Sequence, residues 1–475
     1  MALPLAAFAH PRRALAAAAA LLAGAAGAAR AAEPDFAAAA REARAILARL
    51  VAADTTNPPG DEQRAVAVGA EVLRAEGIAF ETFEFAPGRS DLVARLKGDG
   101  SARPLLLLAH VDVVPSRGQA WTTPPHELTE RDGFLYGRGV SDDLSAAAIE
   151  LETLVLLHRA GLPLRRDVIV AWTGDEERGG GGIRWLLEHA PNAIADAEIA
   201  VNEGGRITLG EDGRPMYLAV ETAEKVYQDF TLRAAGTTGH SSVPVEPNAI
   251  VRLSRAIARL ADRPFPDRLL SHTRELLRAR AASEAPDVAR ALRALADAKG
   301  RLPKDALATV RKNPVLSALL HTTCVATQLE AGNAPNALPA EARANVNCRI
   351  LPDETVEQVL AHLREAVADP GVEIAPVAEF GRAGPSSMTG PGGAEIRSAV
   401  ARLYPGLAVV PSMQLGATDS RFLRERGIAS YGIHPVALRE TDERRMHGID
   451  ERIPADLAPA VRLMYALTAE LAGRR

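Results

Sequence analysis

Short, unbroken apolar runs recur along the chain and are separated by stretches with helical spacing. The runs at residues 105–108, 167–172 and 198–201 are too short for helices, which predicts strands buried on both faces. Residues 144–160 are apolar on nearly every face and predict an interior helix. Buried strands that alternate with helices are typical of an α/β fold with a doubly wound, mostly parallel sheet.

The pattern changes after Val220, where strands begin to alternate between apolar and polar residues. The expected elements are strand 226–234, helix 248–260, strands 322–330 and 342–350, helix 355–368 and strand 372–380. A strand, a helix, two strands, a helix and a strand in this order predict a ferredoxin-like α+β sandwich. Residues 263–312 are rich in Arg and Ala, have helical spacing and resemble an insertion.

With 475 residues the chain is long for one hydrophobic core, and two domains are expected. Helices and strands alternate again near the C-terminus. The first domain would therefore comprise residues 36–223 and 381–475, and residues 224–380 would be inserted into it, with the helical insertion at about 263–312. A net charge of −5 and 4% aromatic residues disfavour a nucleic-acid-binding surface.

Residues 1–32 predict a secretory signal peptide. Arg12 and Arg13 precede an Ala- and Leu-rich run over residues 14–26, and small residues follow at the spacing of a cleavage site. An Ala-rich arm or a retained membrane anchor are the alternatives. A periplasmic or secreted protein, with no membrane association after cleavage, is the expectation. Such a location would permit a disulfide bond between Cys324 and Cys348, which lie on two neighbouring expected strands.

Three of the expected buried strands end in residue types that bind metals. These residues are His110 at the end of the first strand, Asp175, Glu176 and Glu177 after the second, and Glu203 after the third. The carboxyl ends of parallel strands meet at one edge of a sheet, where ligands bind. Side chains alternate along a strand, so Asp112 would lie on the same side as His110 and could orient its ring. Carboxylate and imidazole donors gathered at one edge predict a metal site.

Further motifs complete a resemblance to a known family. In chain order the motifs are His110-Val-Asp112, Gly137-Arg-Gly-x-x-Asp142, Asp175-Glu-Glu177, Glu203-Gly-Gly, Gly239-His240, Asn336-x-x-Pro339 with Arg349, and His447-Gly-x-x-Glu451. From about Ala37 to the C-terminus, the chain resembles the di-zinc amidohydrolases and metallopeptidases: acetylornithine deacetylase, succinyl-diaminopimelate desuccinylase, aminoacylase and glutamate carboxypeptidase. The resemblance implies that the first domain is a zinc catalytic domain and that the inserted domain is a lid and a dimerisation domain.

The resemblance also implies a role for each residue of the site. Two Zn²⁺ ions, or Co²⁺ or Mn²⁺ as substitutes, would be bound by His110, Asp142, Glu177, Glu203 and His447, with Asp142 as the bridge. Glu176 would be the general base, and Asp112 would be the partner of His110. Asn336, Arg349 and the backbone at Gly416 would bind the α-carboxylate of the substrate. His240 would stabilise the oxyanion from the neighbouring subunit of a homodimer.

The implied function is zinc-dependent hydrolysis of an amide bond next to a free α-carboxylate. The substrate would be an N-acyl amino acid, a dipeptide or a peptide C-terminus, so that aminoacylase and carboxypeptidase activities both stay open. A narrow deacylase of an amino-acid biosynthetic intermediate is one alternative, which an export signal disfavours. A non-catalytic binding protein is another, but it would predict loss of Glu176 or of a metal ligand. The family usually has Lys and Gly where this chain has Leu144 and Ser145, which leaves the local charge balance open.

Overall fold

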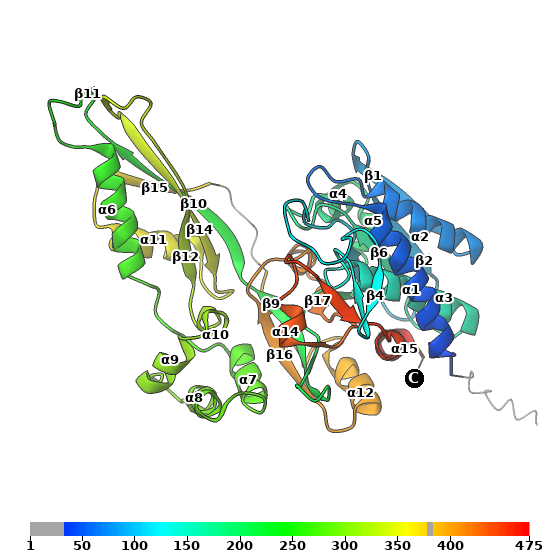
Figure 1. Ribbon diagram of the computed structural model, residues 1–475. Coiled ribbons are helices and arrows are strands. Elements are labelled where there is room, and N and C mark those ends of the chain that lie inside the picture. The colour runs from blue at the N-terminus through cyan, green and yellow to red at the C-terminus, as the bar shows by residue number, and fades with distance from the viewer. Residues whose placement is uncertain (1–32, 378–382, 475) are drawn as a thin grey trace, which may run out of the picture. The chain divides into compact units, whose positions relative to one another are not determined.

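The computed structural model describes residues 33–377 and 383–474 (Figure 1). Its larger sheet has ten strands, and the central strands β6, β3, β7 and β17 run parallel to one another. In spatial order the strands are β1 (Phe80–Ala86), β2 (Arg89–Leu96), β6 (Val168–Thr173), β3 (Leu105–His110), β7 (Ile199–Asn202), β17 (Ala429–Gly432), β9 (Pro215–Glu224), β8 (Ile207–Leu209) and β18 (Leu438–Arg439), while β16 (Ala408–Gln414) pairs with β9. The prediction of an α/β fold with a mostly parallel central sheet is confirmed. The predicted signal peptide, residues 1–32, lies outside the described residues.

Helices cover both faces of this sheet. Leu105 and Leu107 of β3 belong to a core with α1 (Phe36–Ala53), α2 (Gln63–Ala75), α3 (Leu144–Ala160), α12 (Gly393–Leu403) and α15 (Ala458–Ala472). Leu106 and Leu108 belong to a separate core with α4 (Gly181–His189), α5 (Pro191–Ile194) and α13 (Ser420–Glu425). Alternate residues of one strand therefore enter different cores, which explains why this strand has no polar face.

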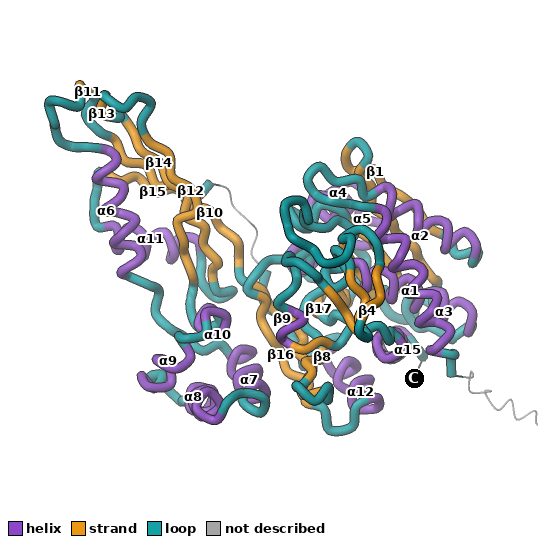
Figure 2. Tube along the Cα trace, in the orientation of Figure 1, coloured by secondary structure: helices purple, strands orange, loops and turns teal. Residues whose placement is uncertain are grey.

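A second sheet has four strands, all paired antiparallel (Figure 2). Its spatial order is β12 (Thr323–Ala331), β14 (Glu341–Ile350), β10 (Val226–Ala235) and β15 (Val372–Pro376), and α6 (Ala249–Asp262) and α11 (Val356–Val367) share its core. This order is the one expected for the predicted ferredoxin-like sandwich. The strand expected over residues 372–380 ends earlier, at Pro376, and residues 378–380 lie outside the described residues.

The predicted helical insertion packs on a different sheet from the one that its position in the chain suggests. It consists of α7 (Ser271–Arg280), α8 (Pro286–Asp297), α9 (Lys304–Val310) and α10 (Pro314–Ala318). Leu277 and Leu292 of these helices share a core with Tyr217 of β9 and Met413 of β16. The helices therefore pack on the ten-stranded sheet, although the chain enters and leaves them from the four-stranded sheet.

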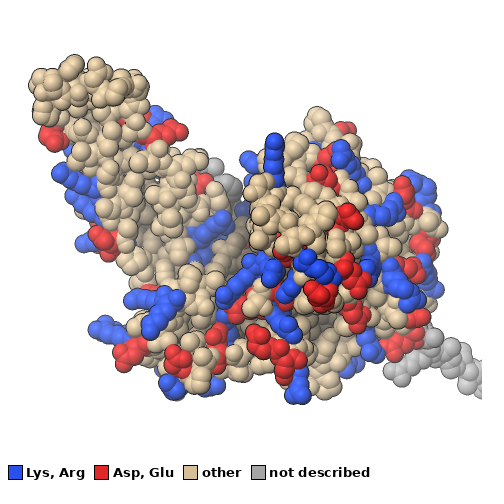
Figure 3. All heavy atoms as spheres, in the orientation of Figure 1, with Lys and Arg blue, Asp and Glu red and all other residues tan. Residues whose placement is uncertain are grey.

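The remaining elements are short. A three-stranded sheet joins β4 (Thr129–Arg131), β5 (Phe134–Tyr136) and β19 (Arg452–Pro454), a two-stranded sheet joins β11 (Gly239–His240) to β13 (Ala337–Leu338), and α14 (Glu440–Glu443) is a single turn. Positive and negative side chains are interspersed on the face in Figure 3, in keeping with the low net charge. No helix in the described part of the chain combines the length and hydropathy needed to span a membrane.

Candidate active site

The candidate ligands meet at one edge of the larger sheet. β3 lies between β6 and β7 and runs parallel to both, so the three carboxyl ends point the same way. β3 ends at His110, β6 is followed by the acidic residues 175–177, and β7 is followed by Glu203. The strand pattern of the sequence therefore predicted this edge correctly.

Asp142 lies between two histidines and directs one carboxylate oxygen toward each. Its Oδ1 is 3.1 Å from Nε2 of His110, and its Oδ2 is 3.0 Å from Nε2 of His447. On the first side Oε2 of Glu203 is 3.7 Å from Nε2 of His110, and on the second side Oε2 of Glu177 is 3.2 Å from Nε2 of His447. The structure thus brings together all five residues that the sequence suggested as metal ligands.

This donor set fits a pair of divalent metal ions. The donor atoms of His110, Asp142 and Glu177 lie within 4.8 Å of one another, and so do those of His110, Glu176 and Glu203. Oε1 of Glu177 and Oε1 of Glu203 are buried and form no hydrogen bond to any described residue. Buried carboxylate oxygens without a donor are unfavourable unless a cation is close, and carboxylates with imidazoles are ligands that Zn²⁺ accepts.

The carboxylates raise the proton affinity of both histidines. Hydrogen bonds to Asp142 and Glu177 raise the pKa of His447 to about 10. Burial favours the neutral form of His110, but Glu203 and the other nearby carboxylates outweigh it, so the pKa of His110 lies well above its usual value. A metal ion would therefore have to displace protons from this site.

Asp112 lies beside His110, as the sequence indicated, but it contacts the ring mainly through its backbone. Nδ1 of His110 donates to the backbone oxygen of Asp112 over 2.9 Å, whereas the carboxylate Oδ1 is 3.6 Å away. Donation from Nδ1 leaves Nε2 free to face Asp142. The Asp112 carboxylate instead accepts hydrogen bonds from the backbone N–H groups of Glu176 and Glu177.

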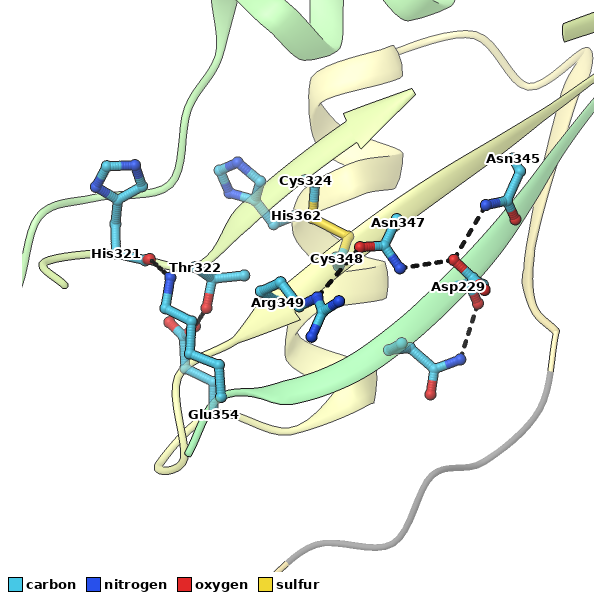
Figure 4. The surroundings of a disulfide bond; sticks show 12 residues. Asp229, His321, Thr322, Cys324, Asn345, Asn347, Cys348, Arg349, Glu354 and His362 are labelled. Carbon is cyan, nitrogen blue, oxygen red and sulfur yellow. Dashed lines mark hydrogen bonds between the residues drawn. A yellow bond between two sulfur atoms is a disulfide. The ribbon is translucent and has the colours of Figure 1, made fainter. Parts of the chain in front are cut away.

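A cleft of about 580 Å³ opens over these ligands. Its lining includes the expected substrate-binding residues Arg349, from β14, and Gly416, and also Tyr227 and Arg421, which the sequence did not reveal. The Arg349 guanidinium lies 4.7 Å from the centroid of the Tyr227 ring, and its Nε donates to Oδ1 of Asn347. Figure 4 shows this arginine next to the bond between Cys324 and Cys348, which confirms that the two cysteines face each other across β12 and β14.

His240 and Asn336 do not line this cleft. His240 pairs with Ala337 where β11 meets β13, and the backbone N–H of Ser241 donates to the backbone oxygen of Asn336. Figure 1 places β11 at one end of the four-stranded sheet. Asn336 precedes β14, whereas Arg349 lies near its far end, and ten residues of strand span about 33 Å. Within one chain these two residues therefore cannot contact the same carboxylate.

Three comparisons with known proteins bear on this site. The model of peptidase family M20/M25/M40 matches residues 106–470. The chain is 31% identical to the human N-fatty-acyl-amino acid synthase/hydrolase PM20D1 over 363 residues, 75% of this chain and 71% of that protein. It is 27% identical to the succinyl-diaminopimelate desuccinylase of Paracoccus denitrificans over 429 residues, 88% of this chain and 95% of that protein.

The fold is similar to that of Sso-CP2, an M20 family metallo-carboxypeptidase from Sulfolobus solfataricus. The TM-score is 0.66 at 18% identity, over 90% of this chain and 99% of that one. At this identity the likeness concerns the fold alone. The family model, in contrast, matches more than half of the sequence and includes every candidate metal ligand. The chain belongs to peptidase family M20/M25/M40.

Proposed function

We propose that this protein is a di-zinc hydrolase that cleaves an amide bond next to a free α-carboxylate. The observation that carries the proposal is the position of Asp142 between His110 and His447, in the same cleft as Arg349. A carboxylate with one oxygen toward each of two donor groups suits a bridge between two metal ions. An arginine in the same cleft suits an anionic substrate.

The metal ligands would divide into two groups. His110 and Glu203 would complete the site of one Zn²⁺ ion, and His447 and Glu177 the site of the other, with Asp142 shared. A pair of metal ions in such a site polarises a carbonyl group and lowers the pKa of water. Co²⁺ or Mn²⁺ would be possible substitutes.

Glu176 would move the proton in this reaction. Its carboxylate lies with the donor atoms of His110 and Glu203, and burial raises its pKa well above the usual value. A carboxylate in this position can accept the proton of the attacking water and pass it to the nitrogen of the departing amine. Glu177, the neighbouring residue, faces His447 instead, so the two glutamates have separate tasks.

Arg349 and the backbone at Gly416 would hold the α-carboxylate. Nε of Arg349 already donates to Asn347, which leaves the two terminal nitrogens of the guanidinium for a bidentate contact. Among the described residues no carboxylate forms an ion pair with Arg349. Burial also lowers its pKa, which a bound carboxylate would reverse.

His240 and Asn336 would reach the cleft of a second copy of the chain. Both lie at one end of the four-stranded sheet, which Figure 1 shows at β11. β12 is an edge strand with Val325 62% and Leu329 60% exposed, so it could pair with the same strand of another copy. The four-stranded sheet would then serve as lid and dimerisation domain of a homodimer.

N-acyl amino acids are the substrate class that we favour over peptides. The names of both relatives describe amides of an amino acid, with a fatty acyl group in one and a succinyl group in the other. The described chain retains Glu176 and all five metal ligands, so a purely binding function has no support. An enzyme exported through the predicted signal peptide, to the periplasm or the medium, would act on substrates outside the cytoplasm. This location disfavours a role in amino-acid biosynthesis.

The decisive experiment tests the purified, Zn²⁺-loaded protein on N-acyl amino acids of graded acyl length, on dipeptides, and on the C-terminal amides of the same compounds. We expect release of the free amino acid from the free acids and little reaction with the amides. Equal hydrolysis of both series would contradict recognition of the carboxylate. No hydrolysis of either series by a protein that binds two metal ions would contradict the proposed reaction.

A further inference from the structure

The turn that carries Glu176 and Glu177 is held by an unusual set of hydrogen bonds. Four consecutive backbone N–H groups donate to carboxylates: Gly174 to Asp91 over 3.0 Å, Asp175 to Glu62 over 3.2 Å, Glu176 to Asp112 over 3.1 Å and Glu177 to Asp112 over 3.3 Å. We call Glu62, Asp91 and Asp112 the carboxylate cradle. All three are fully buried. Burying three carboxylates next to an acidic site costs free energy of folding, so we expect these residues to have a specific role.

Arg89 provides the positive charge of the cradle. Its Nε and Nη2 donate to the two oxygens of Glu62, and its Nη1 donates to Oδ1 of Asp175 over 2.9 Å. Asp175 has a φ of +67°, in the left-handed region that residues other than glycine rarely adopt. The bonds to its side chain and to its N–H group therefore hold a backbone conformation that the residue itself does not favour.

Asn57 connects the cradle to the turn from the opposite direction. Its Nδ2 donates to Oδ2 of Asp112 over 2.8 Å and to Oδ1 of Asp175 over 3.0 Å. Its own N–H group donates to the backbone oxygen of Val113, just beyond β3. Asn57 is 2% exposed, so solvent does not replace these contacts. One amide group thus ties the strand that ends at His110 to the turn that carries the two glutamates.

We propose that Asn57 and the Arg89–Glu62 pair are positioning residues for the hydrolysis, because they fix the direction in which Glu176 and Glu177 leave the turn. The two side chains serve different tasks from adjacent positions, and this requires a backbone that does not rotate. Residues that orient metal ligands from outside the site commonly contribute 10–100-fold to metal affinity or rate, and a displacement of about 1 Å can cost about 100-fold in rate. This inference rests on the proposed function, which assigns the tasks of Glu176 and Glu177.

Asn57→Leu tests the proposal, because leucine has a similar size but no donor. We expect kcat to fall about 10–100-fold with KM within about twofold, and Zn²⁺ affinity, measured against a competing chelator, to fall by a similar factor. Arg89→Gln should behave likewise, and Arg89→Lys should recover part of both losses because it keeps the charge. Arg64→Ala is the matched control: Arg64 is in the same segment and pairs with Asp61 on the surface. It should leave kcat and metal affinity unchanged.

A role in folding alone would give a different result. Asn57→Leu and Arg89→Gln would then lower the thermal unfolding midpoint, while kcat per folded molecule and metal affinity stayed at wild-type values, and this outcome would overturn the proposal. If Asn57→Leu does not fold, Asn57→Ala and Arg89→Gln provide the same comparison, because alanine also lacks a donor. If the wild-type protein binds Zn²⁺ but hydrolyses no substrate, the proposed function fails, and the loss of metal affinity in the variants still decides the positioning role.

Discussion

Individual residues at the sheet edge have tasks that mutation can separate. Glu176→Gln should keep both metal ions but lower kcat by about 10²–10⁴-fold, because a neutral amide cannot accept the proton. Glu177→Gln should instead lower the metal content, since it removes a carboxylate that faces His447. Metal analysis and steady-state kinetics on the same preparations check both results. Comparable turnover by Glu176→Gln and the wild type would contradict the assignment of the base.

The raised pKa values of the histidines predict how metal binding depends on pH. The pKa of His447 is about 10 in the metal-free protein, and only its neutral form can bind a metal ion. Below pH 10 the bound proton must leave, so apparent Zn²⁺ affinity should rise between pH 6 and pH 9. Calorimetric titrations in buffers of different ionisation enthalpy should detect proton release. Affinity that is independent of pH would contradict this picture.

Arg349 offers a test of substrate recognition. Arg349→Ala should lower kcat/KM for free-acid substrates about 100-fold, because the carboxylate loses a charged, bidentate partner. It should affect the corresponding C-terminal amides by less than about threefold. Arg349→Lys is the control that keeps the charge and removes the planar fork. Equal losses on acids and amides would mean that the arginine supports the β14 strand and not the substrate.

The sequence predicts the position of a site residue when that residue lies at the end of a recognisable strand or helix. His110, the acidic turn after β6 and Glu203 could be placed because buried strands reveal where they end. Asn57 could not, because it lies in a turn whose position depends on tertiary contacts. Arg421 lies in helix α13, but helical spacing does not reveal which side chain enters a cleft. The separation of Asn336 from Arg349 could also have been predicted, because the strand expected over residues 342–350, which the structure confirms as β14, lies between them.

At the scale of elements, apolar periodicity predicted long elements well and short or interrupted strands poorly. The bounds of α3 agree with the helix expected over residues 144–160. β8 and β16 went unrecognised because β8 is very short and Pro411 interrupts the pattern of β16. Helical spacing also predicted an insertion near residues 263–312 but could not reveal what it packs against, since an apolar helix face does not specify its partner.

The packing of the inserted helices on the larger sheet gives a stability prediction. Leu292 of α8 is fully buried in the core shared with β9 and β16. Leu292→Ala should lower the free energy of unfolding by about 2–5 kcal/mol through lost burial and a cavity. Val315→Ala, at a side chain of α10 that is 44% exposed, should change it by less than about 0.5 kcal/mol. Denaturant titrations measure both, and a small effect at Leu292 would mean that these helices unfold separately from the sheet.

At the scale of the whole molecule, the proposed homodimer would divide the site between two copies of the chain, because Asn336 and His240 lie far from Arg349. Each chain would provide metal ligands, Glu176 and Arg349 to its own cleft, and His240 and Asn336 to the cleft of its partner. This proposal predicts which pairs of inactive variants restore one another when mixed. Residues of the first group should complement residues of the second, and residues within one group should not.

Three heterodimers test the division. In a heterodimer of His240→Ala with Glu176→Gln, the His240→Ala chain keeps its base and receives an intact histidine, so activity should recover to about half of the wild-type dimer. His240→Ala with Arg349→Ala should recover for the same reason. His240→Ala with Asn336→Ala should stay inactive, because each cleft then receives a partner loop that lacks one of the two residues. Recovery in this third heterodimer, or failure of the first two in verified heterodimers, would mean that His240 and Asn336 do not act as a pair across subunits.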